Sequence, residues 1–306
     1  MSNTHYETPP LHRWMAATPQ INNLSLFELT IPGTHNAGCD WKASYALIPG
    51  KNLTACQDDS FYSQLHLGAR ALDVRLVYNA KAQGFNQFRF QHNGYLSSRN
   101  LEDLVRDVNT FLEENPEEFI ILDFHKLEKG DAEFNLAKFR DLMLEHLGKR
   151  MIPSHNINLT LGQLKQASSL QRVLVAASMT WDTNDNRFNS PIAHKWIGEK
   201  IVTTSDLHGY ITKVMSEPRS RLRLWSLSAT TFTIGPQRIL NDLDNWFSPA
   251  RSDWAQKCNI INFDFIKDSN IVFYCRSANI DKANEKSLIA PRVQANQVHG
   301  VNTPLR

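Results

Sequence analysis

The stretch "NLEDLVRDVNTFLEENPEEFIILDFH", residues 100–125, decides the fold class. Its first part carries an apolar stripe at helical spacing, and Asn100 can cap the predicted helix; the stripe consists of Leu101, Leu104, Val105, Val108, Phe111 and Leu112. The apolar run from Phe119 to Leu122 follows at once and predicts a strand buried on both faces. Another expected strand, "FRFQH" at residues 88–92, precedes the helix. Strand, helix and strand at this spacing are typical of a βαβ unit.

The same alternation runs through the rest of the chain. Helices are expected at about 131–147, 205–215 and 237–247. The expected strands number eight: "FELTI" (27–31), "ALDVRLV" (71–77), "FRFQH" (88–92), "FIILDF" (119–124), "RVLVAAS" (172–178), "IVTT" (201–204), "LRLWSLS" (222–228) and "NIINFDF" (259–265). Eight strands in mostly βα order predict an α/β protein with a distorted (β/α)₈ (TIM) barrel. An open doubly wound sheet is the alternative, but no G-x-G-x-x-G follows the first strand.

No linker divides the chain, so residues 1–306 are expected to form a single domain with its core at about 20–285 and a loose tail at 290–306. The 306 residues are 42% hydrophobic and carry a formal net charge of +2. Both charge signs are interspersed and no basic tract occurs, which argues against a nucleic-acid partner. No apolar run approaches the roughly 20 residues that a membrane-spanning helix needs.

The N-terminus and the cysteines bear on the compartment. The start, "MSNTHYETPPLHRW", lacks the charged and apolar regions of a secretory signal, so the protein is either cytoplasmic or exported with its signal removed. Cys39 and Cys56 form one pair close in sequence, and Cys258 and Cys275 form another. Two short-loop disulfides would suit an exported protein, and four buried thiols are the alternative.

Polar residues follow the expected strands, where the catalytic groups of a barrel lie. They are His35 and Asn36 after the first strand, Asp73 and Arg75 on the second, His92 after the third, Asp123, His125 and Lys126 at the fourth, and Asp264 at the last. Burying such groups without partners costs about 2 to 7 kcal/mol each, so they are expected to face a common pocket. His125 could instead be a core-edge residue and Asp73 a structural acceptor. Histidines outside these motifs, His194 among them, are interpreted as surface or structural residues.

Two histidines with an arginine and carboxylates indicate acid–base chemistry on a phosphate ester. Of His35 and His92, one imidazole can take a proton from an attacking hydroxyl while the other protonates the leaving oxygen. Arg75 can hold the phosphoryl oxygens, and Asp264 can orient one imidazole. No G-x-S-x-G, H-E-x-x-H or P-loop occurs, so serine hydrolases, zincins and NTPases lose support.

Five motifs resemble, in order, the strand motifs of the phosphatidylinositol-specific phospholipase C X-domain, especially the single-domain bacterial enzymes. They are "LTIPGTHNAG" (29–38), "LGARALDVRL" (67–76), "FQHNGYL" (90–96), "EEFIILDFHKLE" (117–128) and "NIINFDF" (259–265). The resemblance runs from about residue 25 to about residue 275, and the first two motifs are the most specific.

The resemblance implies a phosphatidylinositol diacylglycerol-lyase that releases diacylglycerol and inositol 1,2-cyclic phosphate. The inositol 2-hydroxyl would attack phosphorus, with His35 as base, His92 as acid, Arg75 on the phosphate and Asp264 positioning His35. Lys126 and Trp225 are expected to be further substrate contacts. The family also implies a secreted bacterial enzyme, acting as a monomer that touches the membrane transiently. Apolar residues in loops after the strands, namely Trp41, Tyr45, Leu47–Pro49, Trp181 and Phe188, are candidates for that contact.

The motif is a hybrid with respect to metal. In the metal-independent bacterial enzymes the residue after the first histidine is Asp, whereas Asn36 stands here as in the calcium-dependent eukaryotic enzymes. Arg75, however, stands where those enzymes place an acidic ligand. Calcium bound by Asn36, Asp73 and Asp123 is the expectation, since hard cations take such oxygen ligands. A metal-independent mechanism through Arg75 is the alternative.

Other functions remain open. A glycerophosphodiester phosphodiesterase would share the barrel, but its H-R-G opening and Glu-x-Asp pair are missing. A non-catalytic lipid-binding barrel would be expected to have lost one of the two histidines. A barrel glycosidase would need two facing carboxylates, for which Asp73 and Asp123 are the candidates.

Overall fold

The computed structural model describes residues 10–45, 50–198, 201–218 and 223–298, with side chains up to residue 289. Its centre is a sheet of eight parallel strands in the order β7-β6-β5-β2-β1-β10-β9-β8. These strands are β1 (Ile31–Thr34), β2 (Ala71–Tyr78), β5 (Ile120–Glu128), β6 (Val173–Ala177), β7 (Phe188–Asn189), β8 (Ala193–Lys195), β9 (Trp225–Ser228) and β10 (Ile260–Phe263). The expected α/β barrel architecture is confirmed. The barrel is distorted, because β7 and β8 end the sheet and no ladder joins them within the described residues.

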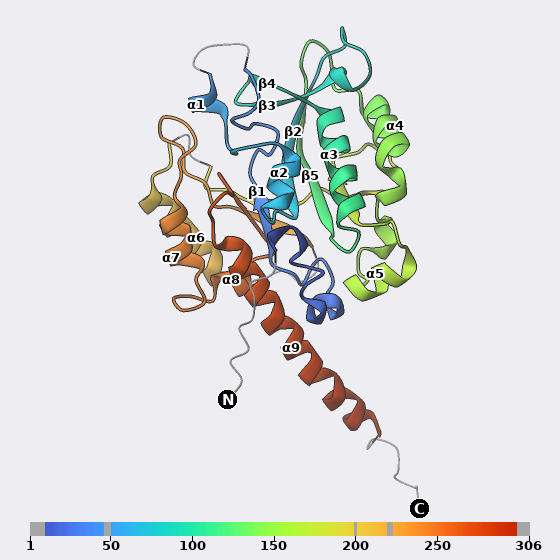
Figure 1. Ribbon diagram of the computed structural model, residues 1–306, viewed down its shortest axis with the longest axis vertical. Helices are drawn as coiled ribbons and strands as arrows, with labels where there is room; N and C mark the ends of the chain where they lie inside the picture. Colours follow the sequence, from blue (N-terminus) through green and yellow to red (C-terminus); the bar gives the residue numbers. More distant parts are fainter. Residues whose placement is uncertain (1–9, 46–49, 199–200, 219–222, 299–306) are drawn as a thin grey trace, which may run out of the picture.

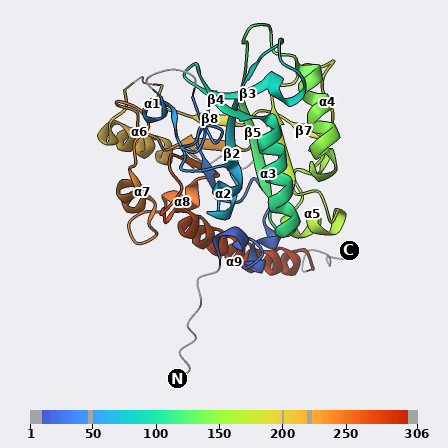
Figure 2. The same ribbon diagram turned by 45° about the horizontal axis from the view of Figure 1, so that its top comes forward.

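Helices flank the sheet on two sides (Figures 1 and 2). One group consists of α3 (Leu101–Glu114), α4 (Leu136–Leu147) and α5 (Leu161–Ala167), and the other of α6 (Thr204–Ser216), α7 (Leu240–Phe247) and α8 (Trp254–Lys257). The connection from β1 to β2 holds α1 (Lys51–Thr54) and α2 (Phe61–His66). Short 3₁₀ helices are η1 (Leu11–Arg13), η2 (Pro19–Asn23), η3 (Gly84–Gln87), η4 (Gly148–Arg150) and η5 (Ser154–Asn156).

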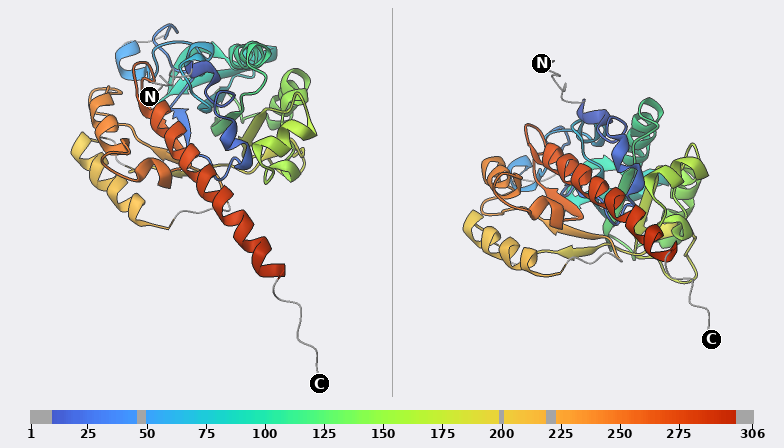
Figure 3. Two further views of the ribbon diagram at one scale, coloured as in Figure 1. Left: turned by 60° about the horizontal axis from the view of Figure 1, so that its bottom comes forward. Right: turned by 90° about the horizontal axis from the view of Figure 1, so that it is seen from below.

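The long helix α9 (Ile271–Val298) crosses beneath the sheet at the end where the strands begin (Figure 3). The backbone amide of Thr30, just before β1, donates to Asn279 Oδ1 at 2.6 Å. The backbone of α9 stays helical through part of the segment expected to be a loose tail, and residues 299–306 lie outside the described residues. With α9 covering this end, access to the barrel interior is left at the opposite end.

The predicted helix and the strand after it are confirmed as α3 and β5, but the strand expected to open the βαβ unit, β3, does not pair with β5. A capping box fixes the start of the helix. Asn100 Oδ1 accepts from the backbone amide of Asp103 at 3.3 Å, and the Asp103 carboxylate accepts from the Asn100 amide at 3.1 Å. This reciprocal pair satisfies amides that would otherwise lack partners in the first turn.

Two expected barrel strands are wrong. "FRFQH" forms β3 (Phe88–His92), which pairs antiparallel with β2 and with β4 (Tyr95–Asn100) and lies outside the parallel sheet. "IVTT" makes a single bridge from Val202 to Phe232, because Thr203 caps α6 through a capping box with Asp206. The short strands β7 and β8 take the two places, and neither is long enough to show an apolar pattern.

Strand β1 begins four residues later than "FELTI" predicts and contains Pro32 and Gly33. Proline lacks an amide hydrogen, but the Pro32 carbonyl still accepts from the Arg70 amide at 2.9 Å. A Cβ on Gly33 would collide with the Asn262 side chain of β10, so glycine permits the close approach of these strands. Pro32 and Gly33 therefore belong to the strand, which brings His35 directly to its end.

All four cysteines are free and buried, so the buried-thiol alternative is confirmed over two disulfides. Among the described residues, no helix is long and apolar enough to cross a membrane.

Candidate active site

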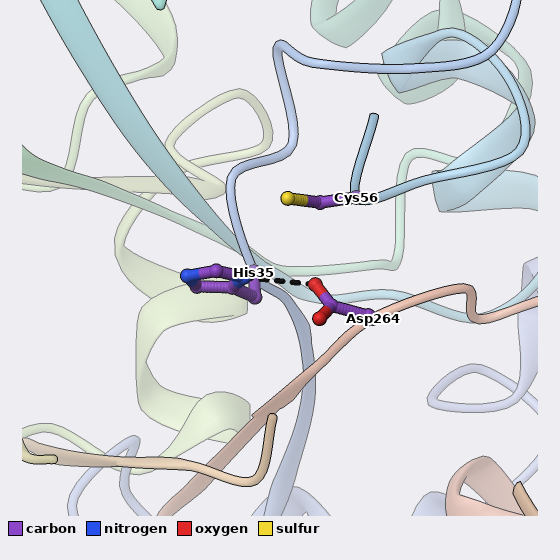
Figure 4. A group of neighbouring side chains, drawn as sticks. All are labelled: His35, Cys56 and Asp264. Carbon is purple, nitrogen blue, oxygen red and sulfur yellow. Dashed lines mark hydrogen bonds and ion pairs between the residues drawn. The ribbon is translucent and has the colours of Figure 1, made fainter. Parts of the chain in front are cut away.

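His35 and Asp264 form the centre of the site. They follow the neighbouring parallel strands β1 and β10, whose register pairs Thr34 with Phe263. His35 Nδ1 lies 2.8 Å from Asp264 Oδ1, and Figure 4 shows the imidazole edge directed at the carboxylate. Burial raises the pKa of Asp264, although the contacts with His35 and Cys56 oppose this change. The carboxylate therefore holds the imidazole in one orientation.

Arg75 lies on β2, which pairs with β1 on its other side. Its Nη2 is 2.9 Å from His35 Nε2 and 2.9 Å from Asp73 Oδ2. Burial alone would raise the pKa of Asp73, but the charges of Arg75 and of nearby histidines together outweigh it and hold this pKa well below its usual range. These partners indicate the tautomer of the neutral His35 ring: Nδ1–H donates to Asp264, and the Nε2 lone pair faces the guanidinium.

His92 reaches the site because β3 runs antiparallel to β2. The register pairs Leu76 with Phe90, and continuing it places His92 level with Val74, next to Arg75. The two imidazole centroids lie 6.0 Å apart with perpendicular rings. His92 Nδ1 lies 2.9 Å from the Thr54 carbonyl, so Nδ1–H donates there and Nε2 is unprotonated in the neutral ring. Burial, followed by the charge of His35, lowers the pKa of His92 to about 3.

The segment after α1 supports both histidines and was missed by sequence reasoning. Cys56 Sγ lies 3.4 Å from His92 Nδ1, and Figure 4 shows its sulfur directed toward the His35–Asp264 pair. Gln57 Nε2 donates to the His35 carbonyl at 3.0 Å. Ligand atoms of Cys56, His35 and Asp264 lie within 4.8 Å of one another, but burial raises the pKa of the thiol well above its usual range. A protonated thiol is a hydrogen-bonding partner and a poor metal ligand.

These groups open into a pocket of about 580 Å³ at the carboxyl ends of the strands. Its lining is mixed: polar and charged residues are His35, Arg75, His92, Asn93, His125, Lys126, His194, Ser228, Thr230, Thr231 and Asp264, and the remainder are Trp196, Val202, Phe232 and Pro236. Lys126 is thus at the pocket as predicted. This one pocket is lined by five of the predicted site residues, namely His35, His92, Arg75, Asp264 and Lys126.

Trp225 does not join them. It is the first residue of β9, at the end of the strand away from the pocket, and it lines a different cavity beside α6. Ser228, the last residue of the same strand, lines the active-site pocket instead. The expected strand 222–228 extends beyond β9 at its amino-terminal side, so its apolar pattern does not show that Ser228, and not Trp225, reaches the pocket.

The three candidate calcium ligands come from neighbouring strands, with Asp73 level with Asp123 between β2 and β5, but both carboxylates already have partners. Asp73 is paired with Arg75, and Asp123 Oδ2 lies 2.8 Å from His194 Nε2. Asn36 is buried with a positive φ of 48°, and its backbone amide faces Asp73 Oδ2 at 3.3 Å. Calcium needs several oxygen ligands that are not already neutralised. The Arg75 guanidinium contacts both Asp73 and His35, so the Asp73 carboxylate is already neutralised.

Sequence comparison finds relatives of limited similarity, and no family model matches the chain. The 1-phosphatidylinositol phosphodiesterase of Listeria monocytogenes is 28% identical over 123 residues, covering 40% of this chain and 35% of that protein. PI-PLC X domain-containing protein 2 of Homo sapiens is 26% identical over 172 residues, covering 49% of this chain and 55% of that protein. The matched segment thus spans about a third to about half the length of these relatives.

Solved structures extend the likeness over most of the fold. A phosphatidylinositol-specific phospholipase C from Staphylococcus aureus superimposes with a TM-score of 0.64 at 12% identity, covering 88% of this chain and 97% of that one. The corresponding enzyme from Listeria monocytogenes gives a TM-score of 0.61 at 18% identity, covering 88% and 99%. The overall architecture is therefore shared along nearly the whole described chain.

Proposed function

This chain groups with the PI-PLC X-domain family in sequence and in fold, and on that premise we propose that it is a phosphatidylinositol-specific phospholipase C. One observation carries the proposal: His35 and His92 face one pocket, and Arg75 lies against the His35 nitrogen that would take a proton. The cleavage would yield diacylglycerol and inositol 1,2-cyclic phosphate. No enzyme nucleophile is needed, because the substrate carries its own hydroxyl.

In the proposed reaction, His35 Nε2 takes the proton from the ring hydroxyl as that oxygen bonds to phosphorus. Asp264 stabilises the resulting imidazolium through the 2.8 Å contact at Nδ1. Arg75 turns its guanidinium to the phosphoryl oxygens, where charge accumulates in the transition state. The bond from phosphorus to the glycerol oxygen breaks, and His92 Nε2 gives that oxygen a proton.

His92 must gain this proton first, because burial keeps it neutral in the free protein. An anionic phosphodiester placed beside the ring raises the pKa of the imidazole, since an opposite charge favours the charged form. Binding of the substrate would thereby load the general acid. The Thr54 carbonyl at Nδ1 keeps Nε2 directed at the pocket during the transfer.

For the cation that neutralises the phosphate, we propose Arg75 and not calcium. The sequence suggests two mechanisms, with calcium as the expectation, and this proposal is the metal-independent alternative. Its support is that Arg75 already bridges Asp73 and His35, and that His194 lies against Asp123. A guanidinium is always charged and offers a fork of donors that matches two phosphoryl oxygens.

We further propose that the mouth of the pocket rests on a lipid surface. Of eight exposed large apolar side chains among the described residues, five lie in loops that follow parallel strands, namely Trp41, Trp181, Trp196, Ile201 and Ile234. Trp196 also lines the pocket. Of the other residues expected there, Phe188 is buried in β7, the Tyr45 hydroxyl donates to the Asp40 carbonyl, and Leu47–Pro49 lies outside the described residues.

The test of the proposed chemistry is cleavage of phosphatidylinositol by His35→Ala and His92→Ala. Removing a general acid or base lowers the rate by about 10² to 10⁴, so both variants are expected to lose activity to that extent. His155→Ala, an exposed histidine in η5, is the matched control and should keep full activity. Near-normal turnover by either active-site variant would contradict the mechanism.

A further inference from the structure

The short segment of residues 54–57, between α1 and α2, contacts both histidines of the active site, yet the proposed reaction uses none of its side chains. From its contacts we infer that Cys56 is a positioning residue, whose thiol holds the imidazole of His92 in the orientation that proton transfer to the leaving oxygen needs. This inference rests on the proposed function and deepens it. It assigns a role to a buried thiol that lies in none of the five sequence motifs.

His92 needs support from outside its own hairpin. It is the last residue of β3, and the chain reverses into β4 through Asn93 and Gly94, which have positive φ angles of 50° and 85°. The ring contacts two other aromatic rings, with centroid distances of 6.0 Å to His35 and 6.1 Å to Phe232. Ring contacts of this kind do not decide where the two nitrogen atoms point, so polar contacts must do so.

Within the described part of the chain, the polar contacts of His92 Nδ1 both come from this segment. The Thr54 carbonyl lies 2.9 Å from Nδ1, and Cys56 Sγ lies 3.4 Å from it. A thiol sulfur is a weak acceptor, so it serves as the second acceptor beside the carbonyl. Two acceptors fix the direction of one N–H more closely than a single carbonyl does, and Nε2 on the other side of the ring is thereby held toward the pocket.

The thiol can donate a hydrogen bond while it accepts one. Cys56 is fully buried, and burial raises the pKa of its thiol well above the usual range, so the sulfur keeps its proton. The S–H can donate to the Thr54 carbonyl at 3.6 Å or to the carboxylate of Asp264, whose pKa the hydrogen bond with Cys56 helps to hold down. With either acceptor, the lone pairs of sulfur are left for the Nδ1–H of His92.

The main chain around the thiol is tied to the strand ends that carry the base. The Cys56 carbonyl accepts from the backbone amide of Phe265 at 2.8 Å, and Phe265 directly follows Asp264. The side chain of the neighbouring Gln57 donates through Nε2 to the His35 carbonyl at 3.0 Å. The thiol is therefore fixed relative to the base and its carboxylate, and through the thiol the acid on the separate hairpin is placed relative to them.

Two inositol phosphodiesters that differ in their leaving group test whether Cys56 acts through the acid. The glycerol oxygen of phosphatidylinositol needs a proton to leave, whereas myo-inositol 1-(4-nitrophenyl phosphate) releases a stable phenolate without one. Cys56→Ala is expected to lower kcat on phosphatidylinositol in mixed micelles about tenfold, with KM within about twofold, because a misoriented acid costs rate and not binding. On the nitrophenyl ester, kcat should stay within about twofold of wild type, since no acid is needed there.

A double variant tests the same point independently. When His92 is already replaced, the thiol has no acid to position. Adding Cys56→Ala to His92→Ala should therefore leave the residual rate on phosphatidylinositol within about twofold. A further loss of about tenfold would show that Cys56 acts on something other than the acid, and would overturn the inference.

Cys56→Ser keeps a donor and an acceptor at the same place, so it should hold kcat on phosphatidylinositol within about threefold of wild type. Cys275→Ala is the matched control, because Cys275 is another fully buried free thiol and lies on α9, at the opposite end of the sheet. Its loss should leave both rates unchanged. Activity on the nitrophenyl ester also reports that each variant is folded.

Equal losses by Cys56→Ala on both esters would show that the thiol merely packs the segment, and would overturn the inference. No loss on either ester would also overturn it, and so would a serine variant as slow as the alanine variant. A wild-type protein that cleaves neither ester would instead overturn the proposed function, and this inference with it.

Discussion

At the scale of single residues, the proposed mechanism relies on Arg75 to balance the negative charge of the phosphate. Its guanidinium contacts His35 and Asp73 at once, at 2.9 Å each. Burial would lower the pKa of Arg75, but the charge and hydrogen bond of Asp73 are the main effects that oppose it, and the net change is upward. The arginine is therefore charged at every working pH and needs no partner from solution.

The protein is accordingly expected to retain full activity on phosphatidylinositol after dialysis against EDTA and in its continued presence. Arg75→Ala should lose at least about 10² in rate with or without added calcium, because one preorganised electrostatic contact contributes that much. Turnover measured across a calcium titration checks both statements. Loss of wild-type activity in EDTA, restored by calcium, would contradict them.

The buried state of His92 predicts a specific dependence of stability on pH. Its pKa is about 3 in the folded protein against an ordinary 6.5, so between these values the unfolded chain binds a proton that the folded chain does not. The stability from the neutral ring is fully present above pH 6.5 and is lost as the pH falls toward 3.

Between pH 6.5 and 4.5, His92 should account for a loss of about 2 to 3 kcal/mol in the free energy of unfolding. In His92→Gln, which does not titrate, this part of the pH dependence is expected to vanish. Urea unfolding at several pH values measures it, and His155→Gln should keep the wild-type slope. Identical slopes for His92→Gln and the wild type would show that the ring is not buried in its neutral form.

At the scale of elements, the loops that follow the strands carry the apolar rim. Trp196, Ile201 and Ile234 are 59%, 67% and 83% exposed, and each lies in a loop after a parallel strand. Leu170 is 46% exposed but precedes β6, at the opposite end of the sheet. Exposed apolar side chains gathered at one end favour contact with a lipid surface at that end.

Trp196→Ala and Ile234→Ser are therefore each expected to weaken binding to phosphatidylcholine vesicles containing phosphatidylinositol by about tenfold, given about 1.5 kcal/mol for burying a large apolar side chain. Leu170→Ser is the matched control and should bind as the wild type does. Vesicle co-sedimentation gives the partition coefficients. If Leu170→Ser weakened binding as much as the rim variants, the membrane would not lie at the pocket mouth.

Helices and strands whose own sequence shows a sustained apolar pattern were predictable. Elements whose structure depends on the strands beside them were not. The stripe of α3 and its Asn100 cap are local features, and the structure confirms both. Pro32 and Gly33 lie within β1 because adjacent strands accommodate them, and no local rule places a proline inside a parallel strand. β8 has three residues, too few to show the alternation that marks a strand.

At the scale of the whole molecule, the grouping of the candidate catalytic residues was predictable because parallel strands bring their carboxyl ends together. His35, Asp73, Arg75 and Asp264 follow from that rule once the strands are known. The positions of His194 and Cys56 at the site depend instead on packing between segments that are distant in the sequence. The spacing of residues along the chain does not indicate such packing. The calcium expectation came from Asn36, but the position of the Arg75 guanidinium, which the sequence does not give, argues against it.

The central claim is that the substrate's own hydroxyl attacks phosphorus while His35 and His92 move the protons. Phosphorus-31 NMR of phosphatidylinositol vesicles during turnover tests it most directly, because a five-membered cyclic phosphodiester and a phosphomonoester give separate resonances. We predict that the cyclic inositol phosphate appears first and that its resonance is absent with His35→Ala. Formation of inositol phosphate from the outset, without the cyclic product, would contradict this account.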